Sequence, residues 1–323
     1  MKKKKKKNYY FLNSLANLTQ SIQVLDSFLN KAAIVTDGEL KSDGSPENPW
    51  RLGSIQHIEE LKCLIRIVPI WISGIICFLA MAQQSTFTLS QALKMDRHLG
   101  PHFRIPAGSL AVINMLALTA FIPVYDRLLV PAARRLTKQP SGITLLQRMG
   151  IGIAVASLSM VVAGLVEEKR RRSAISHGGK LGIAPISVLW LAPQLALMGV
   201  AEAFNAIGQI EFYYKQFPEH MRSFAGALLF CTLAGASYLS TLVVSVVHSS
   251  TRRNGADWLD NNINRGKLDY FYYIIAGMGG LNLLYFLVCS HFYRYKGSPD
   301  QEEITTEEGR MIELNTSKLP TDA

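Results

Sequence analysis

Six stretches of the chain contain no Asp, Glu, Lys or Arg over a length that can cross a membrane. They are residues 67–93, 105–125, 149–166, 181–201, 223–251 and 270–293. An α-helix rises about 1.5 Å per residue, so roughly 20 apolar residues span the ~30 Å hydrocarbon core of a bilayer. A soluble helix of this length would carry a charged face, and these stretches carry none. The sequence therefore predicts an all-α membrane protein with six transmembrane helices.

The polar segments divide the chain into three parts. Residues 1–62 are expected to form a cytosolic lead-in, residues 63–297 the six-helix transmembrane domain, and residues 298–323 a disordered cytosolic tail. In a soluble protein, a net charge of +10 would suggest a nucleic-acid partner. Here, however, much of the excess positive charge lies at residues 2–7 and 169–172. Anionic lipid headgroups are the nearer partner for these cations, so we expect membrane lipid and no nucleic acid.

The segments between the apolar stretches are predicted to be connections at the membrane surface. Residues 126–148 form a long basic connection and residues 167–180 a charged one, while residues 54–66 have the pattern of a short amphipathic surface helix. Proline within a span removes a backbone hydrogen bond and bends the helix. The candidate kink sites are Pro69, Pro123 and Pro193.

Several short strings occur in a distinctive order along the chain. They are FLNKAA at 28–33, MDR at 95–97, PVYDR at 123–127, LQRMGIG at 146–152, GVAEAF at 199–204 and QIEFYYKQFPEHMRS at 209–223. In order and spacing they resemble the central linker and last six helices of the plant nitrate/peptide transporter family, a proton-dependent oligopeptide transporter branch of the major facilitator superfamily. Within that family, the chain is most similar to the subgroup of low-affinity nitrate and glucosinolate carriers.

The resemblance implies one half of a major facilitator fold, with both termini in the cytosol and the protein in the plasma membrane. The twelve-helix members of the family use alternating access. Proton coupling in the family is ascribed to a first-helix motif of two glutamates and an arginine, and this motif has no counterpart in the present sequence. The chain is thus expected to be the C-terminal half of a proton-coupled carrier of nitrate or another small anion. The alternative is a truncated, non-transporting remnant, or an assembly partner of a full-length carrier or another copy.

The sequence contains no Gly-rich phosphate loop, Ser/His/Asp set or metal-ligand cluster. An enzyme is therefore not expected, and neither is a cofactor other than the proton as coupling ion. His98 and His102 have the types to share a metal, but histidines on an exposed loop are usually solvated.

Glu202 is the sharpest candidate for function, because it is the one charged residue between positions 181 and 210. A carboxylate inside a bilayer costs about 3 kcal/mol or more and normally faces a cavity or a partner. By resemblance, the matching glutamate of the family lines the central substrate cavity. The alternative is a structural carboxylate that is bonded to neighbouring helices.

Polar side chains also line the first apolar stretch. Gln84, Thr88 and Gln91 are spaced four and three residues apart and so share one helix face. Amides and hydroxyls bind an anion without a buried counter-charge, which makes these residues candidate substrate contacts. Interhelical hydrogen bonding is the alternative. The resemblance places Met81 where some nitrate carriers of the family have an anion-contacting histidine.

Two further sets of residues are candidates. Asn114 and Tyr238 lie in the middle of apolar stretches and are predicted to line the same cavity, although single polar residues in a span often only join helices. Asp126, Arg127 and Arg134 resemble the charged loop clusters that major facilitators use as cytoplasmic latches. Their alternative role is to set topology as ordinary loop charges.

Overall fold

A computed structural model describes residues 55–137, 142–178, 182–217, 221–253, 257–260 and 262–293. Within these residues, six helices are long and apolar enough to cross a membrane, which confirms the predicted class and number of spans. The predictions for residues 1–54 and 298–323 lie outside the described part of the chain. The long helices are α2 (Ile55–Leu93), α3 (Ala111–Val124), α5 (Leu145–Gly178), α6 (Ala192–Gln216), α7 (Arg222–Arg253) and α8 (Leu268–Phe292).

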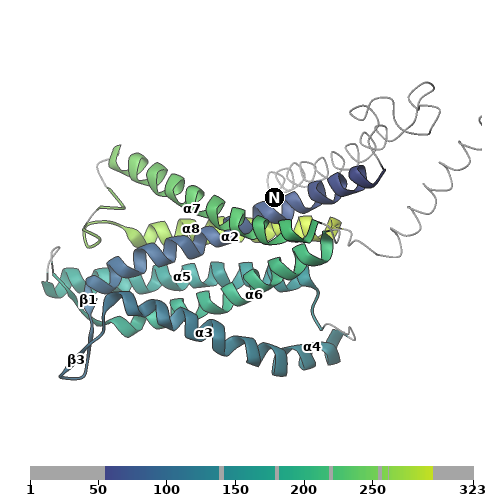
Figure 1. The fold of residues 1–323 in the computed structure, drawn as a ribbon. Coiled ribbons are helices and arrows are strands. Elements are labelled where there is room, and N and C mark those ends of the chain that lie inside the picture. Colours follow the sequence, from purple (N-terminus) through teal and green to yellow (C-terminus); the bar gives the residue numbers. More distant parts are fainter. Residues whose placement is uncertain are drawn as a thin grey trace, which may run out of the picture.

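Short elements join the helices at the two ends of the bundle. β1 (Met95–Asp96) pairs in parallel with β4 (Ala184–Ser187), and β2 (His98–Leu99) pairs antiparallel with β3 (Phe103–Arg104). Figure 1 shows β1 and β3 at the end where α2 finishes, away from α4. The remaining short elements are η1 (Ala107–Leu110), η2 (Tyr125–Leu129), α4 (Val130–Thr137) and η4 (Val188–Leu191).

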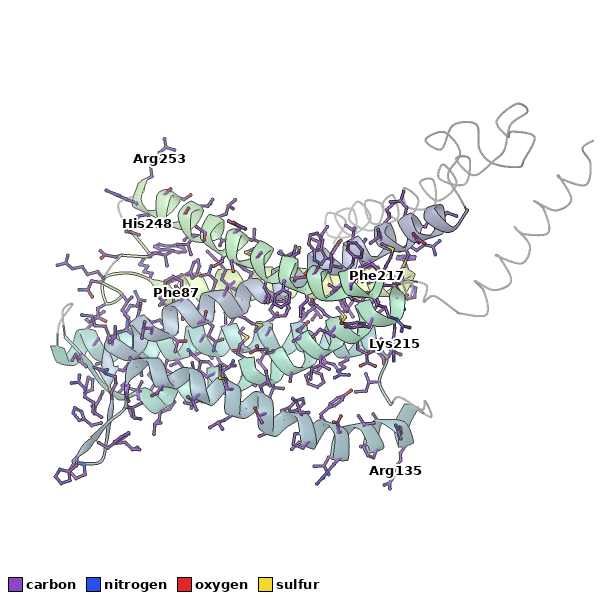
Figure 2. All side chains as sticks on the ribbon, viewed as in Figure 1. Phe87, Arg135, Lys215, Phe217, His248 and Arg253 are labelled. Atoms are coloured by element: carbon purple, nitrogen blue, oxygen red, sulfur yellow. The ribbon has the colours of Figure 1, made fainter. Side chains whose placement is uncertain are left out.

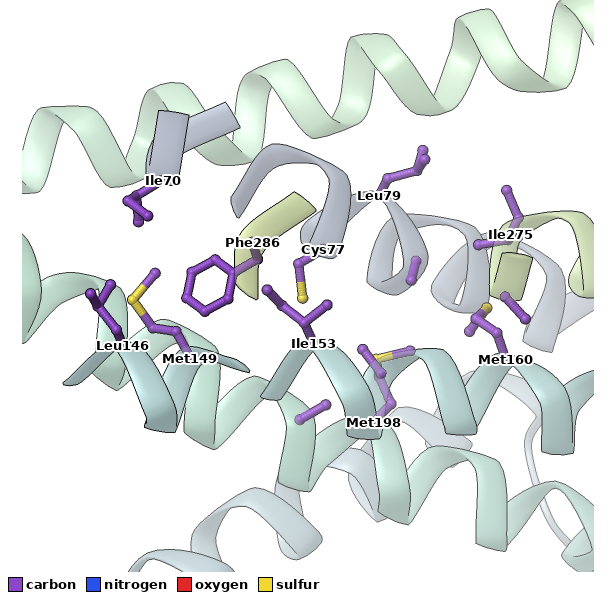
Figure 3. Close-up of a cluster of buried hydrophobic side chains, with 14 of the residues drawn as sticks. Ile70, Cys77, Leu79, Leu146, Met149, Ile153, Met160, Met198, Ile275 and Phe286 are labelled. Atoms are coloured by element: carbon purple, nitrogen blue, oxygen red, sulfur yellow. The ribbon is translucent and has the colours of Figure 1, made fainter. Parts of the chain in front are cut away.

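Helix α5 lies at the centre of the packing, against α6 and α8, and α2 also contacts α7 and α8. The buried residues of α5 alternate three and four positions apart, so they form one face along most of the helix. Methionine contributes to this core: in Figure 3, Met149 lies beside Phe286, and Met160 lies nearer Ile275. The buried residues of the α5 stripe are Met149, Ile153, Ala156, Met160, Ala163, Glu167, Arg170 and Ala174.

Helices α3 and α7 lie at opposite margins of the bundle in Figure 1. Helix α3 packs on α6 and has no buried residue, and α7 packs mainly on α2. Large apolar side chains such as Leu116 and Phe230 are therefore exposed in this chain. Figure 2 places Arg135 and Lys215 at one end of the bundle and His248 and Arg253 at the other, so the long axis of the helices runs between the two charged ends.

Three predicted connections are helical instead. Helix α5 continues to Gly178, so residues 167–178 form its last turns and not a loop. Helix α3 passes through the π-helical segment η2 into α4, which ends at Thr137. Residues 55–66 belong to α2 and do not form a separate surface helix. In α5, charged residues three or four positions apart pair on the helix itself, so charge does not end the helix.

The three prolines have different effects. Pro69 lies inside α2, and Pro123 lies inside α3 directly before the π-helical η2. A π-helical turn absorbs a local change in the hydrogen-bond ladder. Pro193 lies in the first turn of α6, where its missing N–H costs no helical bond, so the prediction of a kink there is wrong.

The contact between α3 and α6 depends on Gly199. A Cβ atom at this position would lie 2.4 Å from the backbone oxygen of Asn114 and 3.0 Å from Cβ of Ala117. Only a residue without a side chain lets the two helices approach this closely, as is common in membrane helix pairs.

We predict that Gly199→Ala destabilises the chain, because overpacking of this kind costs about 1–3 kcal/mol. The measurement is the apparent midpoint of thermal unfolding of the purified protein in detergent. Gly277→Ala is the matched control, because a Cβ atom there meets nothing within 4 Å. Equal midpoints for the two variants would contradict the predicted close contact.

Candidate functional site

Glu202 and Asn114 meet where α6 packs on α3. The amide nitrogen Nδ2 of Asn114 donates a hydrogen bond to Oε2 of Glu202 at 3.0 Å, and both residues are half-buried. Gly199 lies less than one turn before Glu202 and brings the backbone of Asn114 against α6. The structure thus brings together two of the candidate residues that the sequence identified, on neighbouring helices.

Glu202 has no salt bridge among the residues that the structure describes, whereas other acids in the chain do. Glu211, on the same helix, pairs with Arg148 at 3.0 Å and with Lys215 at 2.9 Å. The Oδ1 atom of Asn114 is buried, and it has no hydrogen-bond partner within the described residues. Within a membrane, Glu202 would therefore either be protonated or need a cation from outside these residues.

The polar face of α2 points into the bundle. Gln84, Thr88 and Gln91 are all buried. The hydroxyl Oγ of Ser159 lies 3.1 Å from Oε1 of Gln84 and 2.7 Å from the backbone oxygen of Gln194. These contacts are interhelical hydrogen bonds, as expected under the alternative to a substrate role. The described side chain that bonds to Glu202 lies on α3 and not on this face of α2. The substrate role of the three residues stays a prediction.

Two donors on this face lack a described partner. The Nε2 atom of Gln84 and the Oγ1 atom of Thr88 are buried, and neither has a hydrogen-bond partner within the part of the chain that the structure describes. Buried donors normally find a protein group, a water or a ligand. Binding of an anion by these two atoms stays a prediction.

Tyr238 and Trp190 lie on the surface of the bundle. Tyr238, on α7, is 80% exposed and lies apart from the contact between α3 and α6. Trp190 is also exposed, and Nζ of Lys169 lies 3.4 Å from the centre of its ring. A cation over an aromatic ring is a stable surface pair. The cavity role of Tyr238 stays a prediction, because its side chain is not enclosed by the described residues.

The three proposed gating residues lie at the opposite end of the bundle from β1. Asp126 and Arg127 lie in η2 and Arg134 lies in α4, and all three are exposed. The salt bridges found among the described residues at this end join Glu211 to Arg148 and Lys215 and do not include the three. The latch role therefore stays a prediction.

Arg148, which the sequence interpretation did not identify, connects several elements at this end. It pairs with Glu211, and its guanidinium lies over the ring of Tyr125 at 4.8 Å. Arg148 thus links α5 to α6 through Glu211, and to η2 through Tyr125. Asp126 lies in the same η2 segment.

His98 is bonded to Asp96 in the connection after α2. The backbone N–H of His98 donates to Oδ1 of Asp96 at 3.1 Å, and Nδ1 of His98 lies 2.6 Å from the same oxygen. These contacts hold the pKa of the Asp96 carboxyl below its usual range. The described residues contain no group of three or more His, Cys, Asp or Glu side chains that could hold a metal.

Glu167 and Arg170 form a buried pair that the sequence interpretation missed. Both side chains are 0% exposed, and Nη2 of Arg170 lies 2.6 Å from Oε1 of Glu167. The expectation that residues 169–172 face lipid headgroups is therefore wrong for Arg170. Arg171 is also paired, with Asp269 at 2.9 Å, whereas Lys169 and Arg172 are exposed. The three- and four-residue spacing of the α5 stripe is the signal that could have predicted burial of this pair.

Comparisons with known proteins agree with this architecture. The profile of the POT family matches residues 2–259. The chain is 55% identical to Protein NRT1/ PTR FAMILY 2.13 of Arabidopsis thaliana over 90% of the chain and 47% of that relative. It is 50% identical to Protein NRT1/ PTR FAMILY 2.9 of the same organism over 88% of the chain and 50% of that relative.

A solved structure shows the same fold. The crystal structure of an auto-inhibited POT family peptide transporter has a TM-score of 0.58 and 22% identity, and the match covers 75% of this chain and 44% of that one. The chain thus spans about half of the length of the curated relatives that it matches. By the family profile, the sequence identity and the six membrane-spanning helices, the chain is a multi-pass membrane protein that belongs to the POT family, whose members in these comparisons are transporters and not enzymes.

Proposed function

We propose that the chain is the C-terminal half of a proton-coupled carrier of nitrate or a related small anion, such as a glucosinolate, in the plasma membrane. The observation that carries the proposal is the carboxylate of Glu202. It lies within a membrane-spanning helix and is hydrogen-bonded to a neutral amide, with no counter-ion among the described residues. Alternating access places the substrate and coupling-ion sites of such carriers between two halves, near the middle of the membrane.

The amide of Asn114 suits both charge states of Glu202. Its N–H group donates to the ionised carboxylate at 3.0 Å. Its oxygen Oδ1, which has no described partner, is available to accept a hydrogen bond from a protonated carboxyl group. A carboxyl group that has a partner in either state takes up and releases a proton without being left unsatisfied. This geometry supports Glu202 as a proton-carrying group.

The α2 face supports an anionic substrate. Gln84 and Thr88 offer neutral hydrogen-bond donors without described partners, and such donors bind an anion without a fixed positive charge. A proton on Glu202 removes the negative charge that would repel the anion. Uptake of a proton with each anion is therefore the electrostatic expectation for a site of this composition.

The exposed helices support a second half as partner. Large apolar side chains on α3 and α7 have no cover within the described chain. Exposed apolar faces of this size fit either lipid or another helical unit. We propose that they pack against a first six-helix half or another copy. The second candidate is a non-transporting remnant or an assembly partner of a full-length carrier, which the length match to about half of each relative also fits.

We predict an orientation with both termini in the cytosol. In a cysteine-free background, His102→Cys is then labelled from outside intact cells by a membrane-impermeant maleimide. His102 lies in the connection between α2 and η1, at the opposite end from Arg135. Arg135→Cys is the control and is labelled only after permeabilisation. The reverse pattern of labelling would invert the proposed topology.

A further prediction concerns Glu202 and is tested in the chain joined to the first six-helix half of a relative. Glu202→Gln lowers proton-driven anion uptake about tenfold or more, because a hydrogen bond to a charged group contributes about 1.5–3 kcal/mol and each 1.4 kcal/mol is tenfold. Uptake by the variant also depends less on external pH, because glutamine does not titrate and only the first-helix motif of the joined half is left to carry the proton.

Glu168→Gln is the control, because Glu168 is a partly exposed acid that pairs with Arg172 at the surface of α5. Its uptake stays near that of the parent when both proteins reach the cell surface equally. Unchanged, pH-dependent uptake by Glu202→Gln would leave Glu202 a structural carboxylate.

A further inference from the structure

Glu167 and Arg170 form the most deeply buried ion pair among the described residues. Nε of Arg170 donates to Oε2 of Glu167 at 2.7 Å and Nη2 donates to Oε1 at 2.6 Å, so the contact is bidentate. Both side chains lie on α5, three residues apart, and neither is exposed. The pair is electrically neutral as a unit, and its two-pronged geometry fixes the plane of both side chains.

Each member of the pair also binds a different part of the chain. Nε2 of Gln91, near the end of α2, donates to Oε2 of Glu167 at 2.8 Å. Nη1 of Arg170 donates to Oδ1 of Asn264, in the connection between α7 and α8, at 2.6 Å. Asn264 in turn donates to the backbone oxygen of Gly182 at 2.7 Å. The pair thus joins α2 and two connections to α5.

Gln91 extends the network to two more helices. Its oxygen Oε1 lies 3.2 Å from the hydroxyl of Tyr272 on α8 and 3.3 Å from Nε2 of Gln194 on α6. Hydrogen bonds from α2, α5, α6 and α8 therefore meet at one amide. Because Gln91 shares a helix face with Gln84 and Thr88, its position also fixes how that face is turned toward α5.

Stability alone does not account for such a pair. Removing two charges from water is costly, and well-packed apolar residues of similar volume often replace a buried ion pair with no loss of stability. Apolar side chains, however, provide no directional bonds to Gln91 or Asn264. What the pair adds over apolar packing is the placement of its neighbours.

We propose that Glu167 and Arg170 are positioning residues that hold the end of α2 and the connection between α7 and α8 against α5. Through Gln91 they set the rotation of the polar face of α2. The inference goes beyond the proposed function and does not require that the chain transports, because it concerns the six-helix bundle itself.

The test is hydrogen–deuterium exchange of the purified full chain in lipid nanodiscs, read at residues 88–93 and 262–267. In the double variant Glu167→Leu with Arg170→Met, exchange in both segments rises about tenfold or more, since a bond to a charged group worth about 1.5–3 kcal/mol is lost. The unfolding midpoint stays within a few degrees of the parent, and exchange at residues 149–163 is unchanged.

Glu168→Leu with Arg172→Met is the matched control, because that pair also lies on α5 and is more exposed. It leaves exchange in both segments at the parental level. Reversal of the buried pair, Glu167→Arg with Arg170→Glu, restores at least part of the protection, because the amides of Gln91 and Asn264 can present either N–H or C=O.

Two results would overturn the proposal. Unchanged exchange at residues 88–93 and 262–267 in the apolar double variant shows that the pair only fills space. A uniform rise along all helices with a lower midpoint shows a role in overall stability and not in positioning. If the apolar variant does not fold, Arg170→Lys, which keeps the charge but not the two-pronged contact, is judged by the same segments and the same criteria.

Discussion

An ionised side chain inside a bilayer needs a counter-charge or a proton, because leaving it unpaired in hydrocarbon costs about 3 kcal/mol or more. The chain meets this constraint in two different ways. Glu167 and Arg170 neutralise each other within one helix and are closed off by amides from neighbouring elements. Glu202 has an amide as its described partner and no cation among the described residues. The first arrangement is complete within the chain, and the second is open to a proton or to a partner.

This difference separates two regions of the bundle. Around α5, Glu167 bonds both to Arg170 and to Gln91, so hydrogen bonds join α2 and α5 into one block. The contact of α3 with α6 is held by the close approach at Gly199 and contains Glu202. Helix α3 has no buried residue, so this contact lies at the margin of the block. In the proposed carrier, this margin would face a second half, as alternating access requires.

Sequence length and polarity predicted the six spans because an uncharged run of about 20 apolar residues is characteristic of a membrane-spanning helix. The same criterion set the ends of the helices wrongly. It treated Glu167 as the start of a loop, although the buried stripe continues from Met149 through Arg170 to Ala174 on one face of α5. Charge predicts exposure only when no partner is available on the same face, and here the partner is three residues away.

The candidate site was predictable in part. The meeting of Glu202 with Asn114 follows from one isolated charge and one mid-span amide on helices that proved to be neighbours. The burial of Gln91 among three other helices depends on their order and rotation, which a single sequence does not specify. The same limit applies to Tyr238, whose spacing places it in the middle of a span but does not determine which face of α7 is outermost.

The most direct test of the central claim, that this chain is one half of a two-part carrier, is uptake measured in oocytes at acidic external pH. The chain, a first six-helix half of a relative and the two together are expressed at matched surface levels, with nitrate and a glucosinolate as substrates. The account predicts pH-dependent accumulation only when both halves are present. Robust pH-dependent accumulation by this chain alone, purified as a monomer, would contradict it.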